Sequence, residues 1–474
     1  MREECYLSAA WRSKPSVAER TWTKPRGSKA EQQRPQLANG NEGDATHDFC
    51  LVNFNVLADD LVDSTHYPGV PQELLEWSYR APRLLKHITD GKINADIICL
   101  QEVDNKHFDE TFDRVLTGKG YQGLFKKRTN AKTDGCAIWF KTSTFRMVES
   151  LPIEYFVGET DLLDRDNVAL ALVLEHLHGP KRRKLIVCTT HILFNPRRGD
   201  VKLAQLCKLC TELKTLRARH DGAAIALCGD FNSTPKSAVY EFLTTSRLHD
   251  VHAHEPSHIS GQGLIMATCR RGHRVKAIMT GPHGRSGTFC GRYRAPQNSS
   301  QQTARARDNK LRSSANEAAG DQEDEGVLDM SDANVWSDLQ AGKQPDGNVD
   351  DIIATFVREN GDEESQSEQQ ETMQQEFKRR KPSGICDMPE TLVTGLEPLK
   401  SAYAMQATSQ STGEPAFTTF HDSFQGTVDY IFTGNGLETA EYLALPDTRA
   451  YGMGIPNSKW SSDHLSLAAR FRFC

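Results

Sequence analysis

The chain has 474 residues, of which 38% are hydrophobic and 25% are charged, and its formal net charge is −6. Asp308–Glu376 holds 19 acidic residues and 4 basic ones, so the rest of the chain carries +9. No apolar run approaches the roughly 18 residues of a membrane span. The composition therefore excludes a membrane-spanning protein and favours a mildly basic body, which suits a polyanionic substrate, with an acidic insert.

The twelve cysteines are scattered, and several lie inside apolar, strand-like runs: Cys99, Cys136, Cys188 and Cys228. Buried thiols of this kind are typical of a reducing compartment and not of a disulfide framework. We therefore expect a cytoplasmic protein. The basic run Lys378–Lys381 also allows a nuclear location, although a solvated charge cluster is the simpler interpretation.

The apolar pattern divides the chain into four stretches. Residues 1–47 contain acidic residues and no apolar signal-peptide core, and we predict a disordered tail there. Residues 252–389 form a low-complexity, acidic segment that cannot form a hydrophobic core, and we predict a long disordered insert there. Residues 48–251 and 390–474 would then form a single folded domain.

Apolar runs predict the strands of this domain. In chain order they are residues 50–58, 95–103, 135–140, 168–177, 184–192, 223–231, 427–432 and 464–473. Amphipathic patterns predict helices at residues 71–88 and 199–220, the second with Asp200 at its N-cap. Strands mixed with occasional helices predict an α/β body whose sheets are buried on both faces.

One predicted strand ends in IALCGDFNS, residues 225–233. Side chains of a strand alternate between its two faces, so Asp230 and Asn232 are expected to point the same way. Gly229 would leave room for a ligand to approach the backbone. For this stretch alone the alternative stays open that Asp230 and Asn232 are turn residues, because Pro235 shows that a turn is near.

Other predicted strands also end at polar residues. Asn55 ends the first, Glu102 the second, and His191 the fifth, with Asn195 four residues further on. The last two strands contribute Asp429, Asp463 and His464. Each residue alone has an ordinary explanation as a cap, a turn or a structural hydrogen-bonding group, but together they indicate one site.

Hard cations such as Mg²⁺ take oxygen ligands, typically one or two carboxylates together with water and substrate phosphate. Glu102 and Asp463, with Asn55, would supply those oxygens. This set predicts a metal site suited to phosphoester hydrolysis.

The remaining residues suit the other parts of that reaction. Asp230 would take a proton from the attacking water or orient it, and Asn232 and His191 would donate hydrogen bonds to phosphoryl oxygens. Asp429 would fix the tautomer of the His464 imidazole.

These motifs carry a resemblance to a known family. In this order, LQEV, GDFNS, VDYIF and SSDH resemble the endonuclease/exonuclease/phosphatase superfamily, whose members share a deoxyribonuclease I-like four-layer α/β sandwich. The stretches FNVLAD, RTNAKTDGCAIWF, LLDRDNVAL, THILFNPRRGDVKLAQL and IPNSKWSSDHLSL are similar to the Angel proteins, relatives of Nocturnin and of the cytoplasmic deadenylases. The likeness covers residues 50–250 and 392–473.

The resemblance implies a role for each matching position. Glu102 falls on the principal Mg²⁺ ligand, where Mn²⁺ could substitute. The other active-site positions are occupied by Asn55, His191, Asp230, Asn232, Asp429 and His464. Asn167 and Asn195 are expected to bind substrate, Asn167 at its phosphate, whereas Arg197 and Arg198 are either phosphate contacts or a solvated approach to a helix. No catalytic position is replaced, so an active hydrolase is expected.

The resemblance also implies a substrate, the 3′ end of RNA, such as an mRNA 3′ UTR or poly(A). The expected activity is 3′→5′ exoribonuclease or 2′,3′-cyclic phosphatase, which the catalytic residues alone do not separate. The alternative is a non-catalytic or weakly catalytic mRNA-associated protein that recruits translation or decay factors. Tyr79, Leu84 and Leu85 match the YxxxxLΦ pattern of cap-binding-factor ligands, but apolar periodicity favours burial of both leucines.

Overall fold

The computed structural model describes residues 20–25, 47–158, 162–179, 182–262, 277–279, 287–289, 384–404, 412–421, 424–446 and 454–474. None of the helices in these ranges is both long enough and apolar enough to cross a membrane.

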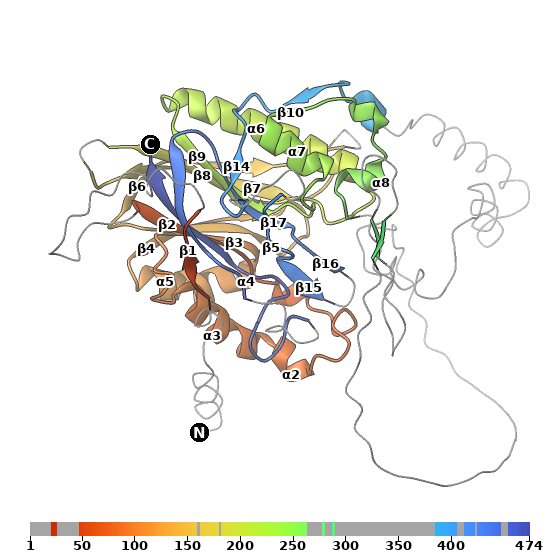
Figure 1. Cartoon of the computed structure of the whole chain (residues 1–474). Coiled ribbons are helices and arrows are strands. Elements are labelled where there is room, and N and C mark those ends of the chain that lie inside the picture. Colours follow the sequence, from red (N-terminus) through yellow and green to blue (C-terminus); the bar gives the residue numbers. More distant parts are fainter. Residues whose placement is uncertain are drawn as a thin grey trace, which may run out of the picture. The chain divides into compact units, whose positions relative to one another are not determined.

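Two mixed sheets form the body of the fold (Figure 1). The first has the strand order β1 (Trp22–Thr23), β18 (Leu437–Leu443), β19 (Leu467–Phe473), β2 (Phe49–Asn55), β3 (Ile97–Asp104), β5 (Asp134–Lys141) and β4 (Tyr121–Lys127). The second has the order β14 (Lys400–Ser401), β17 (Asp429–Thr433), β9 (Ala224–Asp230), β8 (Lys184–His191), β7 (Val168–His176) and β6 (Phe145–Glu154). Within these sheets the pairs β2–β3 and β8–β9 are parallel.

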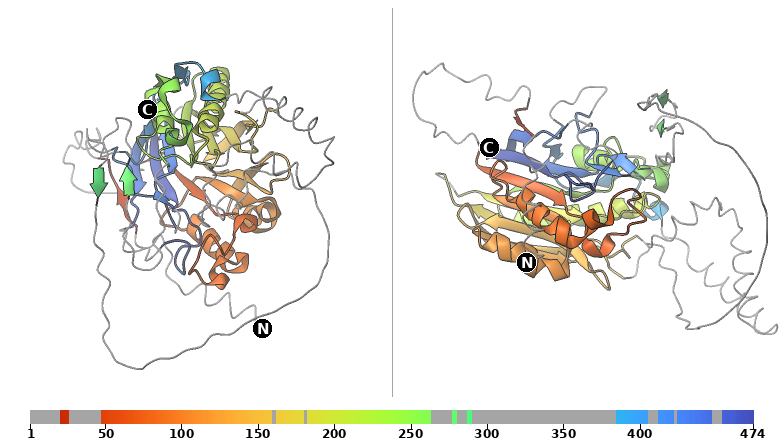
Figure 2. Two further views of the ribbon diagram at one scale, coloured as in Figure 1. Left: turned by 90° about the vertical axis from the view of Figure 1, so that its right-hand side faces the viewer. Right: turned by 90° about the horizontal axis from the view of Figure 1, so that it is seen from below.

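Helices cover the outer face of each sheet, as Figures 1 and 2 show. The helices α6 (Gly199–Arg219) and α7 (Ala238–Thr245) pack on the second sheet, and α3 (Trp77–Ile88) packs on the first. The shorter elements are η3 (Asp59–Leu61), α2 (Gln72–Leu75), α4 (Asn105–His107), η4 (Phe108–Asp113), α5 (Arg114–Thr117), η5 (Val251–Ala253), α8 (Pro256–Ile259) and η6 (Ile385–Asp387). Three two-stranded pairs complete the list: β10 (Arg247–Leu248) with β13 (Leu392–Val393), β11 (Ala277–Met279) with β12 (Gly287–Phe289), and β15 (Thr419–His421) with β16 (Phe424–Gly426).

The core follows from strand alternation. In β9, Ile225 and Leu227 face the helices α6 and α7, while Ala226 and Cys228 face the first sheet. Alternate residues of the other central strands divide in the same way, which gives one apolar layer between the sheets and one under each set of helices. The predicted four-layer α/β sandwich is therefore confirmed.

A polar link joins the two sheets close to the ends of their central strands. Gln101 donates hydrogen bonds from Nε2 to Asn53 Oδ1 (2.8 Å) and to Thr189 Oγ1 (2.7 Å). Asn53 in turn donates from Nδ2 to the carbonyl of Gly229 (3.3 Å). All four residues are buried. Because a buried polar group that lacks a partner is costly, this network favours one alignment of the sheets over others.

Two helix predictions need correction. The predicted helix at residues 71–88 is interrupted at Glu76, which takes an extended backbone (ψ 140°). The carbonyl of Leu75 just before it accepts a hydrogen bond from Nε of the buried Arg80 (2.9 Å). Asp200 is not the N-cap of the second helix, because α6 begins at Gly199, so Asp200 lies in its first turn.

The predicted domain boundaries also shift. Residues 20–25 belong to the fold and not to a tail, because β1 pairs with β18 and the buried Arg20 donates a hydrogen bond to Ser466 Oγ (2.9 Å). At the edges of the predicted insert, Ile259, Ile385 and Met388 are part of the core beneath α6. The remainder of the stretches 1–47 and 252–389 lies largely outside the described residues.

Gly229 is required by the packing of the second sheet. Its φ is +146°, and a Cβ at this position would lie 2.0 Å from the carbonyl oxygen of Thr190 on the adjacent strand β8. The prediction that Gly229 leaves room for a ligand is therefore wrong, since neighbouring backbone already fills the space.

We expect Gly229→Ala to lower the free energy of unfolding by about 3 kcal/mol or more, because both the backbone conformation and the space oppose a side chain. Chemical denaturation measures the change. The matched control is Gly91→Ala, where a Cβ would meet nothing within 4 Å, and we expect it to stay within about 0.5 kcal/mol of wild type. Equal stabilities for the two variants would contradict the prediction.

Candidate active site

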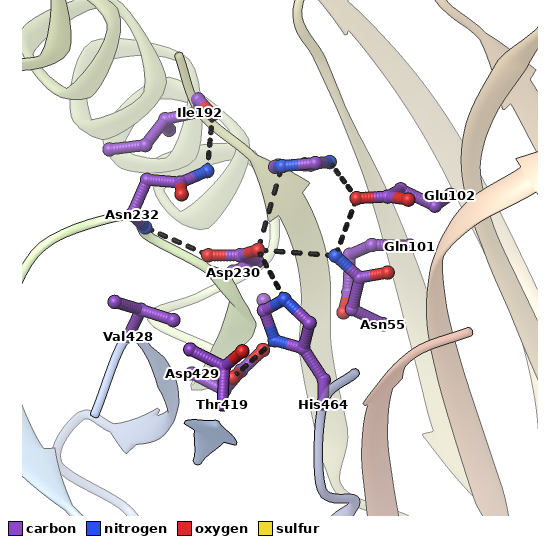
Figure 3. Close-up of polar contacts among 12 residues, drawn as sticks. Asn55, Gln101, Glu102, Ile192, Asp230, Asn232, Thr419, Val428, Asp429 and His464 are labelled. Atoms are coloured by element: carbon purple, nitrogen blue, oxygen red, sulfur yellow. Dashed lines mark hydrogen bonds and ion pairs between the residues drawn. The ribbon is translucent and has the colours of Figure 1, made fainter. Parts of the chain in front are cut away.

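The polar residues that end the central strands meet at one end of the sandwich (Figure 3). Asn55 ends β2 and Asp230 ends β9, and both occupy positions whose side chains face the space between the sheets. Asn55 Nδ2 donates a hydrogen bond to Asp230 Oδ2 (3.2 Å), which joins the two sheets directly. His191, at the end of β8, and Asp429, at the start of β17, are both paired in register with Asp230.

Glu102 reaches this site because β3 contains a bulge. Ile97 and Cys99 face the second sheet, so strict alternation would turn Glu102 away from it. The register between β3 and β5 shifts after Leu100, and Glu102 has a φ of +55°. A bulge redirects side chains in this way. As a result, Glu102 Oε1 accepts a hydrogen bond from Asn55 Nδ2 (2.8 Å).

Asp230 lies at the centre of the site. Its Oδ2 is 3.5 Å from His191 Nε2 and 3.7 Å from His464 Nε2, in addition to the hydrogen bond from Asn55. Its Oδ1 accepts a hydrogen bond from the backbone N–H of Asn232 (2.8 Å). Burial, and then the neighbouring charge of Asp429, raise the pKa of Asp230 above its ordinary value. Such a carboxylate is a stronger base than an exposed one.

The two histidines of the site have different protonation. Burial lowers the pKa of His191. Burial also opposes a charge on His464, but the carboxylates of Asp429, Asp230 and Asp463 outweigh it, and the pKa of His464 is well above its ordinary value. His464 donates a hydrogen bond from Nδ1 to Asp429 Oδ2 (2.8 Å). At neutral pH the site therefore combines an imidazolium at His464 with a neutral imidazole at His191.

Asn232 lies beside Asp230, as expected, but for a different reason. Strand β9 ends at Asp230, and Asn232 has a φ of +42°, so strand alternation does not determine its direction. Asn232 is held instead by its N–H bond to Asp230 and by a hydrogen bond from its Nδ2 to the carbonyl of Ile192 (3.1 Å).

The predicted phosphate contacts are only partly gathered. Asn167 immediately precedes β7, whose Val168 pairs with His191. Asn195 accepts a hydrogen bond at Oδ1 from the backbone N–H of Arg197 (2.9 Å), and Arg197 itself is exposed.

The second predicted arginine, Arg198, forms an ion pair with Asp200 (3.1 Å). The roles of Arg197 and Arg198 stay predictions.

The carboxylates fit a hard divalent cation. Burial, together with the charges of Asp463 and Asp134, raises the pKa of Glu102 to about 7. Asp463 Oδ2 accepts a hydrogen bond from the Tyr67 hydroxyl (2.9 Å), but its Oδ1 is buried and has no hydrogen-bond partner in the described part of the chain. Asp429 Oδ1 is likewise buried and has no hydrogen-bond partner among the described residues. Crowded carboxylates with unpaired oxygens are the donor set that such a cation would hold together.

Among the described residues, two groups of three Asp or His side chains have potential metal-ligand atoms within 4.8 Å of one another. The first is Asp230, Asp429 and His464. The second is Asp59, Asp104 and His107, where Lys106 already forms an ion pair with Asp59 (3.2 Å).

Several residues that support the site were not predicted from the sequence. Thr418 Oγ1 donates a hydrogen bond to Asp429 Oδ2 (2.6 Å), and Ser462 Oγ donates to the carbonyl of Asn55 (2.7 Å). These short polar residues lie in loops, where no periodicity distinguishes them. Ser462 at least belongs to the SSDH motif, which was a usable signal.

A two-sheet sandwich with carboxylates, amides and histidines at its strand ends defines a class of phosphoester hydrolase. The chain belongs to the endonuclease/exonuclease/phosphatase family, whose model matches residues 52–464. Both activities in the family's description, nuclease and phosphatase, hydrolyse phosphoester bonds.

Curated relatives include the mouse protein angel homolog 2, which is 30% identical over 449 residues, covering 90% of this chain and 69% of that protein. Carbon catabolite repressor protein 4 homolog 3 of Arabidopsis thaliana is 30% identical over 436 residues, covering 90% and 75%. The match to the human protein angel homolog 2 is 41% identical over 207 residues and spans 38% of that protein's length.

Among solved structures, the chain resembles ANGEL2, described as a 2′,3′-cyclic phosphatase, in complex with adenosine-2′,3′-vanadate. The TM-score is 0.60 at 27% identity, covering 96% of this chain and 99% of that one. A second ANGEL2 structure gives a TM-score of 0.58 at 28% identity.

Removing the charge of Asp429 should lower the pKa of His464. Asp429 makes the largest of the contributions that oppose the effect of burial, so the pKa of His464 should be lower in Asp429→Asn than in wild type. The raised pKa also contributes stability that is complete below the unfolded value near 6.5 and is lost as pH rises through the folded value. The variant should have less of that contribution.

NMR titration of histidine-labelled protein measures this pKa. Thr418→Val is the matched control, because it removes the other hydrogen bond to Asp429 Oδ2 and keeps the charge. An unchanged His464 titration in Asp429→Asn would show that Asp429 does not set its protonation.

Proposed function

We propose that this protein is a Mg²⁺-dependent phosphoesterase that acts on RNA 3′ ends, and that a 2′,3′-cyclic phosphate is its preferred terminus. The observation that carries this proposal is the arrangement around Asp230, where two histidines and Asn232 surround one buried carboxylate. The likeness to a 2′,3′-cyclic phosphatase bound to adenosine-2′,3′-vanadate supports the choice of terminus.

In this reaction Asp230 orients the attacking water and accepts its proton, since burial raises the pKa of its carboxyl. The water oxygen bonds to phosphorus, one bond from phosphorus to a ribose oxygen breaks, and the released ribose oxygen takes up a proton to become a hydroxyl. His464, held as an imidazolium by Asp429, stabilises the negative charge that develops on the phosphoryl oxygens. His191 and Asn232 add neutral donors beside it.

The cation would be held by Glu102 and Asp463, with Asn55 beside them. When bound, a divalent cation polarises phosphoryl oxygens and neutralises developing charge. Asn55 contributes by holding Glu102 and Asp230 at fixed separation through two hydrogen bonds from its Nδ2 (2.8 and 3.2 Å).

A 3′→5′ exoribonuclease is the second candidate, because the same carboxylate and donors would serve a terminal phosphodiester. The non-catalytic alternative has less support. Leu84 is 1% exposed and lies in the core, as its periodicity predicted, whereas Leu85 is only partly buried. The YxxxxLΦ stretch therefore does not offer the Leu84 side chain to a cap-binding factor.

The deciding experiment uses one RNA sequence with three 3′ termini: hydroxyl after an oligo(A) tail, 3′-phosphate and 2′,3′-cyclic phosphate. Each carries a 5′ label and is incubated with and without Mg²⁺. We expect conversion of the cyclic terminus without shortening, and loss of that conversion in excess chelator. A ladder of shortened products would favour the exonuclease, and no turnover of any RNA would contradict both.

Three variants test the assigned roles. Glu102→Ala should abolish turnover, because it removes a charged oxygen ligand. Asp230→Asn should cost roughly 10²–10⁴-fold, and higher pH should not restore it, since an amide has no proton to lose in that range. Asn232→Ala should cost roughly 10²–10³-fold, as expected for one preorganised donor. Wild-type rates in Asp230→Asn and Asn232→Ala would show that Asp230 and Asn232 are only turn residues after a strand.

A further inference from the structure

Lys202 is a buried lysine close to the site. It lies on α6 and is 0% exposed. Its Nζ donates hydrogen bonds to the carbonyl of Asn232 (2.6 Å) and to Gln262 Oε1 (2.6 Å), and it forms no ion pair with a carboxylate in the described ranges. Burial lowers the pKa of Lys202 to about 7, and both the ammonium and the neutral amine keep enough hydrogens for two acceptors.

Burying this amine without a carboxylate partner opposes folding, and an apolar side chain of similar length would avoid that cost. The two acceptors explain where the side chain is directed. One is a neutral side-chain amide, and the other is the backbone of a residue in the candidate site.

Three polar groups of Asn232 form hydrogen bonds, each with a different part of the chain. Its N–H binds Asp230, its Nδ2 binds the Ile192 carbonyl, and its own carbonyl binds Lys202. A φ of +42° is sparsely populated by residues other than glycine and persists where the surroundings enforce it. Of these three hydrogen bonds, the one with Lys202 is made by a helix residue.

The same face of α6 holds two more parts of the site. Gln205, one turn after Lys202, is also 0% exposed. Its Oε1 accepts a hydrogen bond from the N–H of Leu193 (2.9 Å), and its Nε2 donates to Asn167 Oδ1 (3.3 Å). The helix itself is closely packed, since a Cβ at Gly199 would lie 2.4 Å from Ile259 Cβ.

We propose that Lys202 is a positioning residue, which holds the backbone of Asn232 in its left-handed conformation and so directs the Asn232 carboxamide beside Asp230. Gln262 completes this arrangement by orienting the amine. The expected change in kcat rests on the proposed function, whereas the expected change in the conformation of Asn232 does not depend on any activity.

The kinetic test is Lys202→Met with the cyclic-phosphate RNA. Misplacing one donor should lower kcat roughly 10²-fold and leave KM within about threefold, because Asn232 acts on charge that develops during the reaction. The double variant Lys202→Met/Asn232→Ala should be no slower than Asn232→Ala alone. Additive losses, or a loss confined to KM, would overturn the proposal.

Lys208→Met is the matched control on the same helix. Lys208 is partly exposed and pairs with Glu212 (3.2 Å), so its removal should leave kcat and KM unchanged. If Lys202→Met does not fold, Lys202→Gln keeps one donor, and we expect its kcat to fall between wild type and Asn232→Ala. A kcat equal to wild type would overturn the proposal.

The structural test is a crystal structure of the folded Lys202 variant beside that of wild type. We expect Asn232 to leave its left-handed conformation and to lose its hydrogen bond to Ile192. An unmoved Asn232 would overturn the proposal whatever the kinetics. If wild type turns over none of the three RNAs, the proposed function fails, and the position of Asn232 still decides the role of Lys202.

Discussion

The hydrogen bonds of Asn55 join the two sheets at the point where the chemistry is assembled. One Nδ2 group donates to Glu102 from its own sheet and to Asp230 from the opposite sheet. Two carboxylates this close repel each other, and a neutral amide that donates to both keeps them near without charge. The arrangement depends on the alignment of the sheets, which the buried Gln101 network favours a few residues behind the site.

The charged groups of the site also set one another's protonation. Asp230 is surrounded by imidazoles, and the proton of one of them, His464, depends on Asp429. On the other side, Glu102 Oε1 lies 3.9 Å from Nδ1 of His191, whose pKa burial lowers, and the buried Oδ1 of Asp463 has no hydrogen-bond partner in the described part of the chain. The site is therefore divided into a half that carries its own positive charge and a half that a cation would complete.

Much of the site could be predicted from the sequence because buried strands have a strict period of two. Asn55, His191, Asp230 and Asp429 extend the inward-facing positions of their strands. Glu102 could not be placed this way, since a bulge turns it toward the site. The strand β6 was missed although its burial alternates clearly, while β1 and Arg20 depend on partners over 400 residues away, which local patterns do not contain.

The helix α6 shows what a pattern of apolar residues leaves out. The amphipathic period correctly predicts a helix near residues 199–220 that packs on a sheet, yet Lys202 and Gln205 are as buried as the leucines between and around them. A lysine and a glutamine in such positions need partners, because an unpaired buried polar group costs free energy. Lys202 binds the backbone of Asn232, and Gln205 binds the N–H of Leu193 and the side chain of Asn167. Buried polar side chains on this helix face therefore point to the loops that the helix supports.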